Sequence, residues 1–302
     1  MTEEIRDLLR RALREDIGRG DVTTEALIPK NQRGEAVIIA KEAGIFCGGI
    51  VAQEIFKLRD ASLKILRNAK EGSRIRKGQT VFTVRGRIRP ILEVERVALN
   101  FLGKLSGIAT LTRAFVERVR GTKAKIFDTR KTTPLWRELE KYAVRCGGGA
   151  NHRSGLWDEV LVKDNHWTAI WQILDETQCR YFGQRLRPFQ RRRIPIEIEV
   201  QSLKELAHLL EGTLVPDRIL LDNFSIKELR RAVLFVNGLD QVLRSRYDLR
   251  RKNPLLEASG GIHLNHIRQV ASTGVDRISI GRLTHSAPAI DFSLKIKKVM
   301  NA

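Results

Sequence analysis

The sequence predicts an α/β fold in which a small mixed α/β unit precedes a parallel α/β barrel. Beyond residue 120, apolar runs of strand length recur, each ends in a polar or glycine-rich turn, and helical patterns separate several of them. Strands that alternate with helices form βα units on a parallel sheet, and six successive units favour a barrel over an open sheet. The six runs are KAKIFDTRK, DEVLVKDN, IPIEIEV, DRILLDNF, LLEASGG and DRISIGR.

The N-terminal unit is predicted from shorter patterns. Apolar side chains at helical spacing predict an amphipathic helix over residues 3–14, and a turn-rich stretch over 16–29 follows it. The stretches EAVIIAKEAGIF (35–46) and TVFTVRG (80–86) are typical of strands, and the unit ends near Pro90.

A helical pattern then covers residues 91–120, and it contains Gly103 and Gly107. Glycine is unfavourable inside a helix because it gains more conformational freedom than other residues when the helix unfolds. We therefore expect these two residues to break the segment into two helices.

The composition is that of a globular protein with excess positive charge. Of 302 residues, 42% are hydrophobic and 30% are charged, and the formal net charge is +20. Such a charge favours an anionic partner, which could be nucleic acid, an acidic membrane surface or a polyanionic small molecule. The densest basic run, RLRPFQRRR at 185–193, could be a nucleic-acid patch, but a solvated loop before a buried strand is the favoured interpretation.

Targeting and cysteine patterns favour a cytoplasmic protein. No apolar run has the roughly 18 to 20 residues of a membrane span, and the N-terminus lacks an apolar secretion core. Cys47, Cys146 and Cys179 are an odd number without a CxxC pair, so neither a disulfide framework nor a thiolate metal site is indicated. We expect reduced, buried thiols.

Candidate site residues lie at the strand ends, because the loops after the strands of an α/β barrel converge on one mouth. In IPIEIEV, the two-residue period of a strand places Glu197 and Glu199 on one face, directed into the barrel. Buried carboxylates need partners, which could be Lys131, Lys163 or a bound Mg²⁺; a purely structural ion-pair network is the alternative. The strand-end residues are Asp128 to Lys131, Lys163, Glu199, Asp222, Ser259 to Gly261 and Gly281.

Two glycine turns predict a phosphate site. The stretches EASGGI and SIGRLTHS each place glycine between a strand and a helical pattern, at the last two strand ends. Backbone N–H groups at such turns, with a helix dipole behind them, bind anions, and barrels often keep a phosphate pocket in their last two loops. For either turn alone, a plain tight turn is the alternative. His152 and His285 lie in loops expected to face the same mouth.

Several motifs, in order and spacing, resemble those of the quinolinate phosphoribosyltransferase family. They are FDTRKTTP, GGGANHRSGLWD, VLVKDNH, IEIEV, LLDNF, EASGGI and ISIGRLTHSAPAIDFSLKI, with LREDIGRGDVTTEALIP and ERVALNFLGKLSGIATLT upstream. The resemblance spans nearly the whole chain. It implies the type II phosphoribosyltransferase fold: an N-terminal α/β sandwich domain over residues 1–105, completed by the C-terminal tail 286–302, and an open TIM-like α/β barrel over residues 106–285.

The resemblance also implies an activity. Members of this family are pentosyltransferases that join quinolinate to phosphoribosyl pyrophosphate with Mg²⁺ and release nicotinate mononucleotide, pyrophosphate and CO₂ in NAD biosynthesis. Both substrates are polyanions, which accounts for a site rich in cations. We expect no specific nucleic-acid partner and no membrane partner.

Residue roles follow from the matched motifs. Arg130, His152 and Arg153 are expected to hold the quinolinate carboxylates, with Thr129 beside them, because the planar donor fork of arginine suits a carboxylate. The matching Arg96 is expected to reach the site from a neighbouring subunit, so the active form is expected to be a homodimer or a higher oligomer.

The remaining roles concern phosphoribosyl pyrophosphate. Lys131 and Lys163 are expected to lie between the substrates and neutralise charge. Glu199 and Asp222 are expected to bind the ribose hydroxyls and place Mg²⁺, directly or through water or substrate. These four residues are the expected catalytic set. The expected 5-phosphate ligands are Ser259, Gly260, Gly261, Ile280, Gly281, Arg282 and His285.

One departure concerns pocket shape. After DTRKTTP, where the family usually has glycine, this chain has Leu135 and Trp136. The closest alternative functions are those of paralogues with the same fold, either the molybdenum-transport-associated relatives or an enzyme that uses nicotinate. Intact Arg130, His152 and Arg153 favour a dicarboxylate over a monocarboxylate. A nucleic-acid-binding protein is the alternative from another class.

Overall fold

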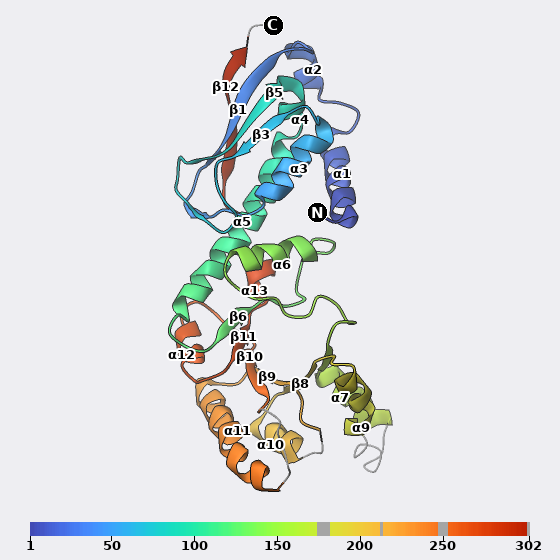
Figure 1. The fold of residues 1–302 in the computed structure, drawn as a ribbon, viewed down its shortest axis with the longest axis vertical. Helices are drawn as coiled ribbons and strands as arrows, with labels where there is room; N and C mark the ends of the chain where they lie inside the picture. Colours follow the sequence, from blue (N-terminus) through green and yellow to red (C-terminus); the bar gives the residue numbers. More distant parts are fainter. Residues whose placement is uncertain (174–181, 212–213, 247–252, 301–302) are drawn as a thin grey trace. The chain divides into compact units, whose positions relative to one another are not determined.

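The computed structural model describes residues 1–173, 182–211, 214–246 and 253–300 (Figure 1). The chain divides into two compact units, the first comprising Met1–Arg113, Thr132–Gly148 and Arg282–Ala302, and the second Ala114–Lys131 and Gly149–Gly281. The segment Thr132–Gly148 thus groups with the first unit, although the range predicted for the barrel includes it. The predicted domain boundaries remain predictions.

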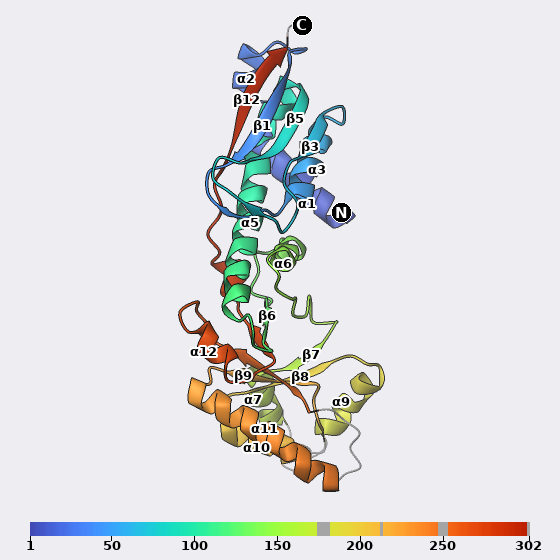
Figure 2. The same ribbon diagram turned by 60° about the vertical axis from the view of Figure 1, so that its left-hand side comes forward.

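The first unit is built on a four-stranded antiparallel sheet in the order β12-β1-β5-β3. The C-terminal strand β12 pairs along the whole length of β1, so residues from both ends of the chain share one sheet. Helices α1 and α3 pack on each other beside this sheet (Figures 1 and 2). The elements are α1 (Glu3–Ile17), α2 (Val22–Leu27), β1 (Arg33–Ala40), β2 (Gly44–Ile45), α3 (Gly49–Arg59), β3 (Lys64–Arg67), β4 (Arg74–Ile75), β5 (Thr80–Arg87), α4 (Ile88–Glu93), α5 (Glu95–Arg118), α6 (Arg137–Cys146), α13 (Arg282–His285) and β12 (Phe292–Met300).

The expected break at Gly103 and Gly107 is wrong, because α5 runs without interruption from Glu95 to Arg118. The two glycines instead allow another segment of the chain to pack closely against the helix. A Cβ on Gly107 would lie 2.0 Å from the carbonyl oxygen of Pro288, and one on Gly103 would lie 2.8 Å from that of Ile290. The backbone N–H of Ile290 donates to the carbonyl of Gly103 at 3.0 Å. The segment before β12 therefore lies directly against the backbone of this helix.

Two further local predictions are wrong. The stretch predicted to be turns contains α2, whose start is capped by Asp21, and the basic run predicted to be a loop lies largely in α9 (Phe182–Arg191). In α9, Leu186 packs in an apolar core while the arginines are exposed, and the helix continues past the internal Pro188.

The second unit confirms the predicted parallel sheet. Its six strands are those predicted, in the order β6-β11-β10-β9-β8-β7, and every neighbouring pair is parallel. Strands β6 and β7 form its two edges, consistent with an open α/β barrel. Figure 2 shows α10 and α11 together on one side of the sheet. The elements are β6 (Lys125–Phe127), β7 (Val160–Val162), α7 (Asp164–Ile173), α9, β8 (Ile196–Val200), α10 (Leu203–Glu211), β9 (Arg218–Asp222), α11 (Ile226–Arg246), β10 (Leu255–Ser259), α12 (Ile267–Ala271) and β11 (Arg277–Ser279).

Strand β8 has the two faces that its alternation predicts. Ile196 and Ile198 pack with Leu186, Val162 and Leu214 in an apolar core outside the sheet. Glu197 and Glu199 are also buried, on the opposite face of the strand. Both carboxylates are thus buried on the face of the sheet opposite the apolar core, where each needs a partner.

In the described part of the chain, no helix combines the length and apolarity that crossing a bilayer requires.

Candidate active site

The carboxyl ends of all six strands lie at one edge of the parallel sheet, which gathers the predicted polar residues. Asp128 follows β6, Lys163 follows β7, Glu199 lies near the end of β8, and Asp222 and Ser259 end β9 and β10. Because ligands bind at this edge of parallel α/β sheets, the second unit carries the candidate site.

Asp128 anchors the segment that carries His152 and Arg153. Its fully buried carboxylate accepts the backbone N–H of His152 at 2.8 Å and the side-chain amide of Asn151 at 2.6 Å. Ala150 also forms a parallel bridge with Phe127 at the edge strand. The sequence identified Asp128 only as a strand end; its spacing from the NHR motif, 24 residues from His152, gives no signal of this contact.

His152 lies between two buried carboxylates. Its Nε2 is 3.1 Å from Glu197 and 3.3 Å from Glu257. Glu197 also faces Arg218, which pairs with Glu159, and Glu257 pairs with Arg277. The partners of Glu197 are therefore His152 and Arg218. Lysine or Mg²⁺ was the predicted partner of the buried carboxylates, and a structural ion-pair network was the stated alternative.

Two effects act in opposite directions on the His152 ring. Burial lowers its pKa, but the hydrogen bonds and charges of Glu197 and Glu257 outweigh burial and raise the pKa to about 9. In contrast, Nδ1 accepts the backbone N–H of Arg153 at 2.8 Å, which requires that nitrogen to carry no proton. A pKa of about 9 would protonate both nitrogens at neutral pH, but the observed hydrogen bond fixes the neutral ring, with its proton on Nε2 and directed to the carboxylates.

The positive charges of Arg153 and Arg130 act on each other. Burial, and then the charge of Arg130, lower the pKa of Arg153. Arg153 donates from one terminal nitrogen to the carbonyl of Glu159 at 3.1 Å, whereas its buried Nε has no hydrogen-bond partner among the described residues. Arg153 is buried and Arg130 is half-buried, and their like charges repel, so this arrangement favours an anion that contacts both.

Lys163 and Glu199 form an ion pair at the sheet edge, with 3.6 Å between Nζ and the carboxylate, as the sequence proposed for Lys163. Burial raises the pKa of Glu199, Lys163 opposes that shift, and the charges of Asp222 and Asp164 add to it. Three carboxylates thus act on one another near one lysine. Asp164, the first residue of α7, was not among the predicted site residues.

The glycine turn after β10 has the backbone that an anion cradle needs. Gly260 and Gly261 adopt φ of 89° and 57°, and a Cβ on Gly260 would lie 2.1 Å from the side-chain oxygen of Asn223. No helix stands directly behind this turn, because α12 begins only at Ile267 and is 5 residues long. The expected helix dipole is therefore wrong for this loop, and the backbone N–H groups of the turn remain as donors.

The predicted residues fall into both compact units. Thr129, whose hydroxyl accepts the backbone N–H of Lys131 at 3.0 Å, lies in the second unit with the residues above. Ile280, whose N–H donates to Phe127 at 3.0 Å, and Gly281 also lie there. The exposed Arg96, the half-buried Arg282 and the exposed His285 belong to the first unit. The partners that sequence reasoning missed are Asp164, Asn223 and Glu257, and for Asp128 it missed the contact with His152.

The fold and the edge residues define a class: an α/β-barrel protein whose strand ends combine arginine, lysine, carboxylate and a glycine turn, as enzymes acting on phosphorylated or carboxylated substrates do. Family models for quinolinate phosphoribosyl transferase match both parts of the chain, the N-terminal domain over residues 21–106 and the C-terminal domain over residues 108–295. The chain therefore belongs to the quinolinate phosphoribosyltransferase family.

Named relatives agree over almost the full length. The chain is 40% identical over 296 residues to the carboxylating nicotinate-nucleotide pyrophosphorylase of Mycobacterium leprae, covering 96% of each protein. It is 37% identical to the probable enzyme of this name from Bacillus subtilis, covering 97% of this chain and 93% of the relative. The crystal structure of the nicotinate-nucleotide pyrophosphorylase from Francisella tularensis superposes with a TM-score of 0.84 at 34% identity, covering 99% of this chain and 96% of that one.

Proposed function

We propose that this chain is a cytoplasmic pentosyltransferase that transfers the phosphoribosyl group of phosphoribosyl pyrophosphate to quinolinate. The products are nicotinate mononucleotide, pyrophosphate and CO₂, a step of NAD biosynthesis. The observation that carries the proposal is the pair of neighbouring guanidinium groups, Arg130 and Arg153, at the carboxyl edge of the barrel sheet. A dianionic pyridine relieves their repulsion better than a monoanion does.

In this proposal the quinolinate carboxylates bind between Arg130 and Arg153. The free Nε of Arg153 supplies a donor that the protein itself leaves unused among the described residues. His152 acts mainly by position: its ring is locked between Glu197 and Glu257, and its Nδ1 fixes the backbone of Arg153. The binding site is thus preorganised, which lowers the entropic cost of binding.

Phosphoribosyl transfer separates charge, and the edge residues suit that step. As pyrophosphate leaves, the ribose ring becomes cationic, and the carboxylates of Glu199 and Asp222 stabilise it. Lys163, with Lys131, offsets the negative charge of the leaving group. The pyridine nitrogen attacks the anomeric carbon, and the resulting ring cation accepts the electron pair left when the adjacent carboxylate departs as CO₂. A proton then replaces the carboxylate on the ring carbon.

Magnesium fits this part of the site. Asp222 and Asp164 disfavour the charged form of Glu199, and a hard divalent cation that prefers oxygen ligands relieves such repulsion. Glu199 and Asp222 would hold the ion, directly or through water. When bound, it neutralises pyrophosphate charge.

The 5-phosphate is assigned to the Ser259–Gly261 turn, in which Gly260 and Gly261 have positive φ, and the backbone N–H groups of the turn are the proposed donors. Ile280 and Gly281, which belong to the same unit, are proposed to add to the phosphate site, and the roles of Arg282 and His285 in phosphate binding remain predictions. Arg96 is exposed near the start of α5, which suits a residue that enters the site of a neighbouring subunit in a homodimer.

The proposal is tested with purified protein, phosphoribosyl pyrophosphate and Mg²⁺, incubated in parallel with quinolinate or nicotinate. Mass spectrometry follows the mononucleotide and the released CO₂. We expect nicotinate mononucleotide and an equal amount of CO₂ from quinolinate alone. Product from nicotinate without CO₂ would instead identify a nicotinate-using paralogue, and product from neither would reject the proposal.

A further inference from the structure

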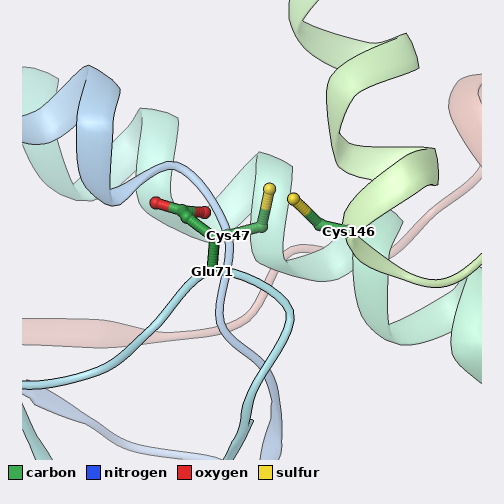
Figure 3. Close-up of side chains that lie close together, drawn as sticks. All are labelled: Cys47, Glu71 and Cys146. Carbon is green, nitrogen blue, oxygen red and sulfur yellow. The ribbon is translucent and has the colours of Figure 1, made fainter.

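Two cysteines from distant parts of the chain meet in the first unit. Cys47 lies between β2 and α3 and is fully buried, whereas Cys146 ends α6 and is half-buried. Their sulfur atoms and a carboxylate oxygen of Glu71 all lie within 4.8 Å of one another. Figure 3 shows the two sulfur atoms facing each other, with the Glu71 carboxylate directed to the other side of Cys47.

Both cysteine backbones are held in place. The hydroxyl of Ser106 accepts the N–H of Cys47 and donates to its carbonyl, each at 3.0 Å. A Cβ on Gly72, whose φ is 75°, would lie 3.0 Å from the carbonyl oxygen of Cys146, so the end of α6 packs closely on this turn. The sulfur atoms therefore stay close together in the folded protein.

The cluster suits a disulfide better than a metal ion. A metal ion requires both sulfurs as thiolates, but burial raises the pKa of Cys47 far above its ordinary value, and Glu71 adds negative charge. Both carboxylate oxygens of Glu71 are already engaged, accepting the N–H groups of Gly48 and Ile50 at 3.0 and 3.2 Å at the start of α3. A disulfide is neutral and needs no ligand from Glu71.

The two thiols differ in accessibility and in pKa, and this difference indicates which one reacts first with an oxidant. Cys146 is partly accessible, and its pKa is lowered by a hydrogen bond from Cys47, with help from Tyr142 and Arg145 against the opposing effects of burial and Glu71. Cys47 is inaccessible and remains a thiol. An oxidant thus meets Cys146 first, and the buried thiol is in place to resolve the product.

We propose that Cys47 and Cys146 are a redox modification site, at which a peroxide converts the two thiols into a reversible intramolecular disulfide. The Cys146 thiolate attacks one oxygen of hydrogen peroxide, breaks the O–O bond and becomes a sulfenic acid, while the other oxygen leaves as water after protonation. The sulfur of Cys47 then displaces the sulfenic hydroxyl as a second water, with loss of the Cys47 proton. In total, two thiols and one peroxide give one disulfide and two waters.

The test uses the full chain with Cys179→Ser, so that only these two thiols remain. The reduced protein is treated with hydrogen peroxide, denatured and labelled with a thiol reagent, and its peptides are mapped with and without reductant. We expect no labelled thiol after oxidation, a peptide that joins Cys47 to Cys146 within one chain, and full recovery of both thiols with dithiothreitol. Persistence of both thiols, or irreversible oxidation of Cys146 without a crosslink, would overturn the proposal.

Single variants separate the roles of the two cysteines. Cys47→Ser in the same background is expected to trap the sulfenic acid on Cys146, detectable with dimedone, whereas Cys146→Ser is expected to leave Cys47 unmodified. Modification of Cys47 in the latter would contradict the assigned order. Zinc that stays with the reduced protein through dialysis, and is lost in both serine variants, would make the cluster a metal site and overturn the proposal. Transferase activity of each variant reports that it is folded.

Discussion

At the scale of single residues, Arg153 is the strongest test of the substrate site. We expect Arg153→Ala to raise the quinolinate KM about 100-fold or more, because a charge-assisted bond in a buried site is lost. Arg153→Lys is the matched control: it keeps the charge but not the planar fork, so we expect an intermediate loss. Steady-state kinetics measure both, and calorimetric binding of phosphoribosyl pyrophosphate, which should be retained, shows that the variants are folded. An unchanged KM for Arg153→Ala would remove this residue from the pocket.

Leu135 is a residue whose backbone conformation conflicts with its side chain. It has φ of 66° and the residue is 80% exposed, so it bears the cost of a left-handed conformation without a packing benefit. We expect Leu135→Gly to raise the free energy of unfolding by about 0.5–1 kcal/mol, the relief being partly offset by the entropy of glycine in the unfolded chain. Leu135→Ala keeps the strain and should give no such gain in urea unfolding. A loss of stability in the glycine variant would show that Leu135 makes a stabilising contact.

Trp136 shows why a departure from a family pattern need not disturb a fold. Its ring stacks on Phe101 with 4.3 Å between ring centres and an angle of 1° between the planes. The bulky residue therefore gains an aromatic contact of a kind that stabilises proteins. The sequence marked this position as unusual but could not identify the partner, which lies on α5.

At the scale of elements, the N-cap of α2 gives a prediction with a defined pH dependence. Asp21 accepts the backbone N–H of Thr24 at 3.0 Å and its hydroxyl at 2.5 Å, and these bonds lower the Asp21 pKa. We expect Asp21→Ala to cost about 1 kcal/mol of unfolding free energy near pH 7. Because the folded-state pKa is the lower one, this advantage of the wild type is complete above the unfolded-state pKa of about 4 and is lost as the pH falls through the folded-state value.

The control for this cap is Asp21→Asn, which keeps an acceptor oxygen but does not titrate. Urea unfolding near pH 7 and near pH 3 should show the deficit of Asp21→Ala relative to the wild type shrinking at low pH, whereas its deficit relative to Asp21→Asn should stay constant, because neither variant titrates at this position. An alanine deficit relative to the wild type that is the same at both pH values would mean that the carboxylate charge contributes nothing to the cap.

The elements also show which structure the sequence can predict. The six parallel strands were predicted because each is a short apolar run bounded by turn residues, a local signal that burial preserves. The continuity of α5 was not predicted. Gly103 and Gly107 lie where a segment near the C-terminus, far away in the sequence, packs against the helix backbone, and local sequence does not show this contact. Helix α9 was not predicted because its sequence is dominated by basic residues, and the one buried leucine, Leu186, does not form a helical apolar pattern by itself.

The candidate site also contains residues that local sequence patterns predict and contacts that they do not. Residues that sit at strand ends, such as Lys163, Glu199 and Asp222, follow from the alternation of strands and helices. The pairing of Lys163 with Glu199 was anticipated, since the two residues lie at the ends of neighbouring strands. The network of His152, Glu197 and Glu257 was not, because those contacts join β8 and β10 to an irregular segment and leave no trace in local periodicity.

At the scale of the whole molecule, the proposed homodimer predicts that two inactive variants can restore activity when they form a mixed dimer. If Arg96 completes a site whose Lys131 belongs to the neighbouring subunit, Arg96→Ala and Lys131→Ala dimers are each inactive, but a mixed dimer contains one site with both residues intact. Random exchange makes half of the dimers mixed, each with one working site of two, so about a quarter of wild-type activity should return. Exchange is confirmed by native mass spectrometry with differently tagged chains, and the control mixes Arg96→Ala with a differently tagged Arg96→Ala, which should stay inactive. Mixed dimers without activity would place Arg96 outside the shared site, because every other component of the intact site is present in them.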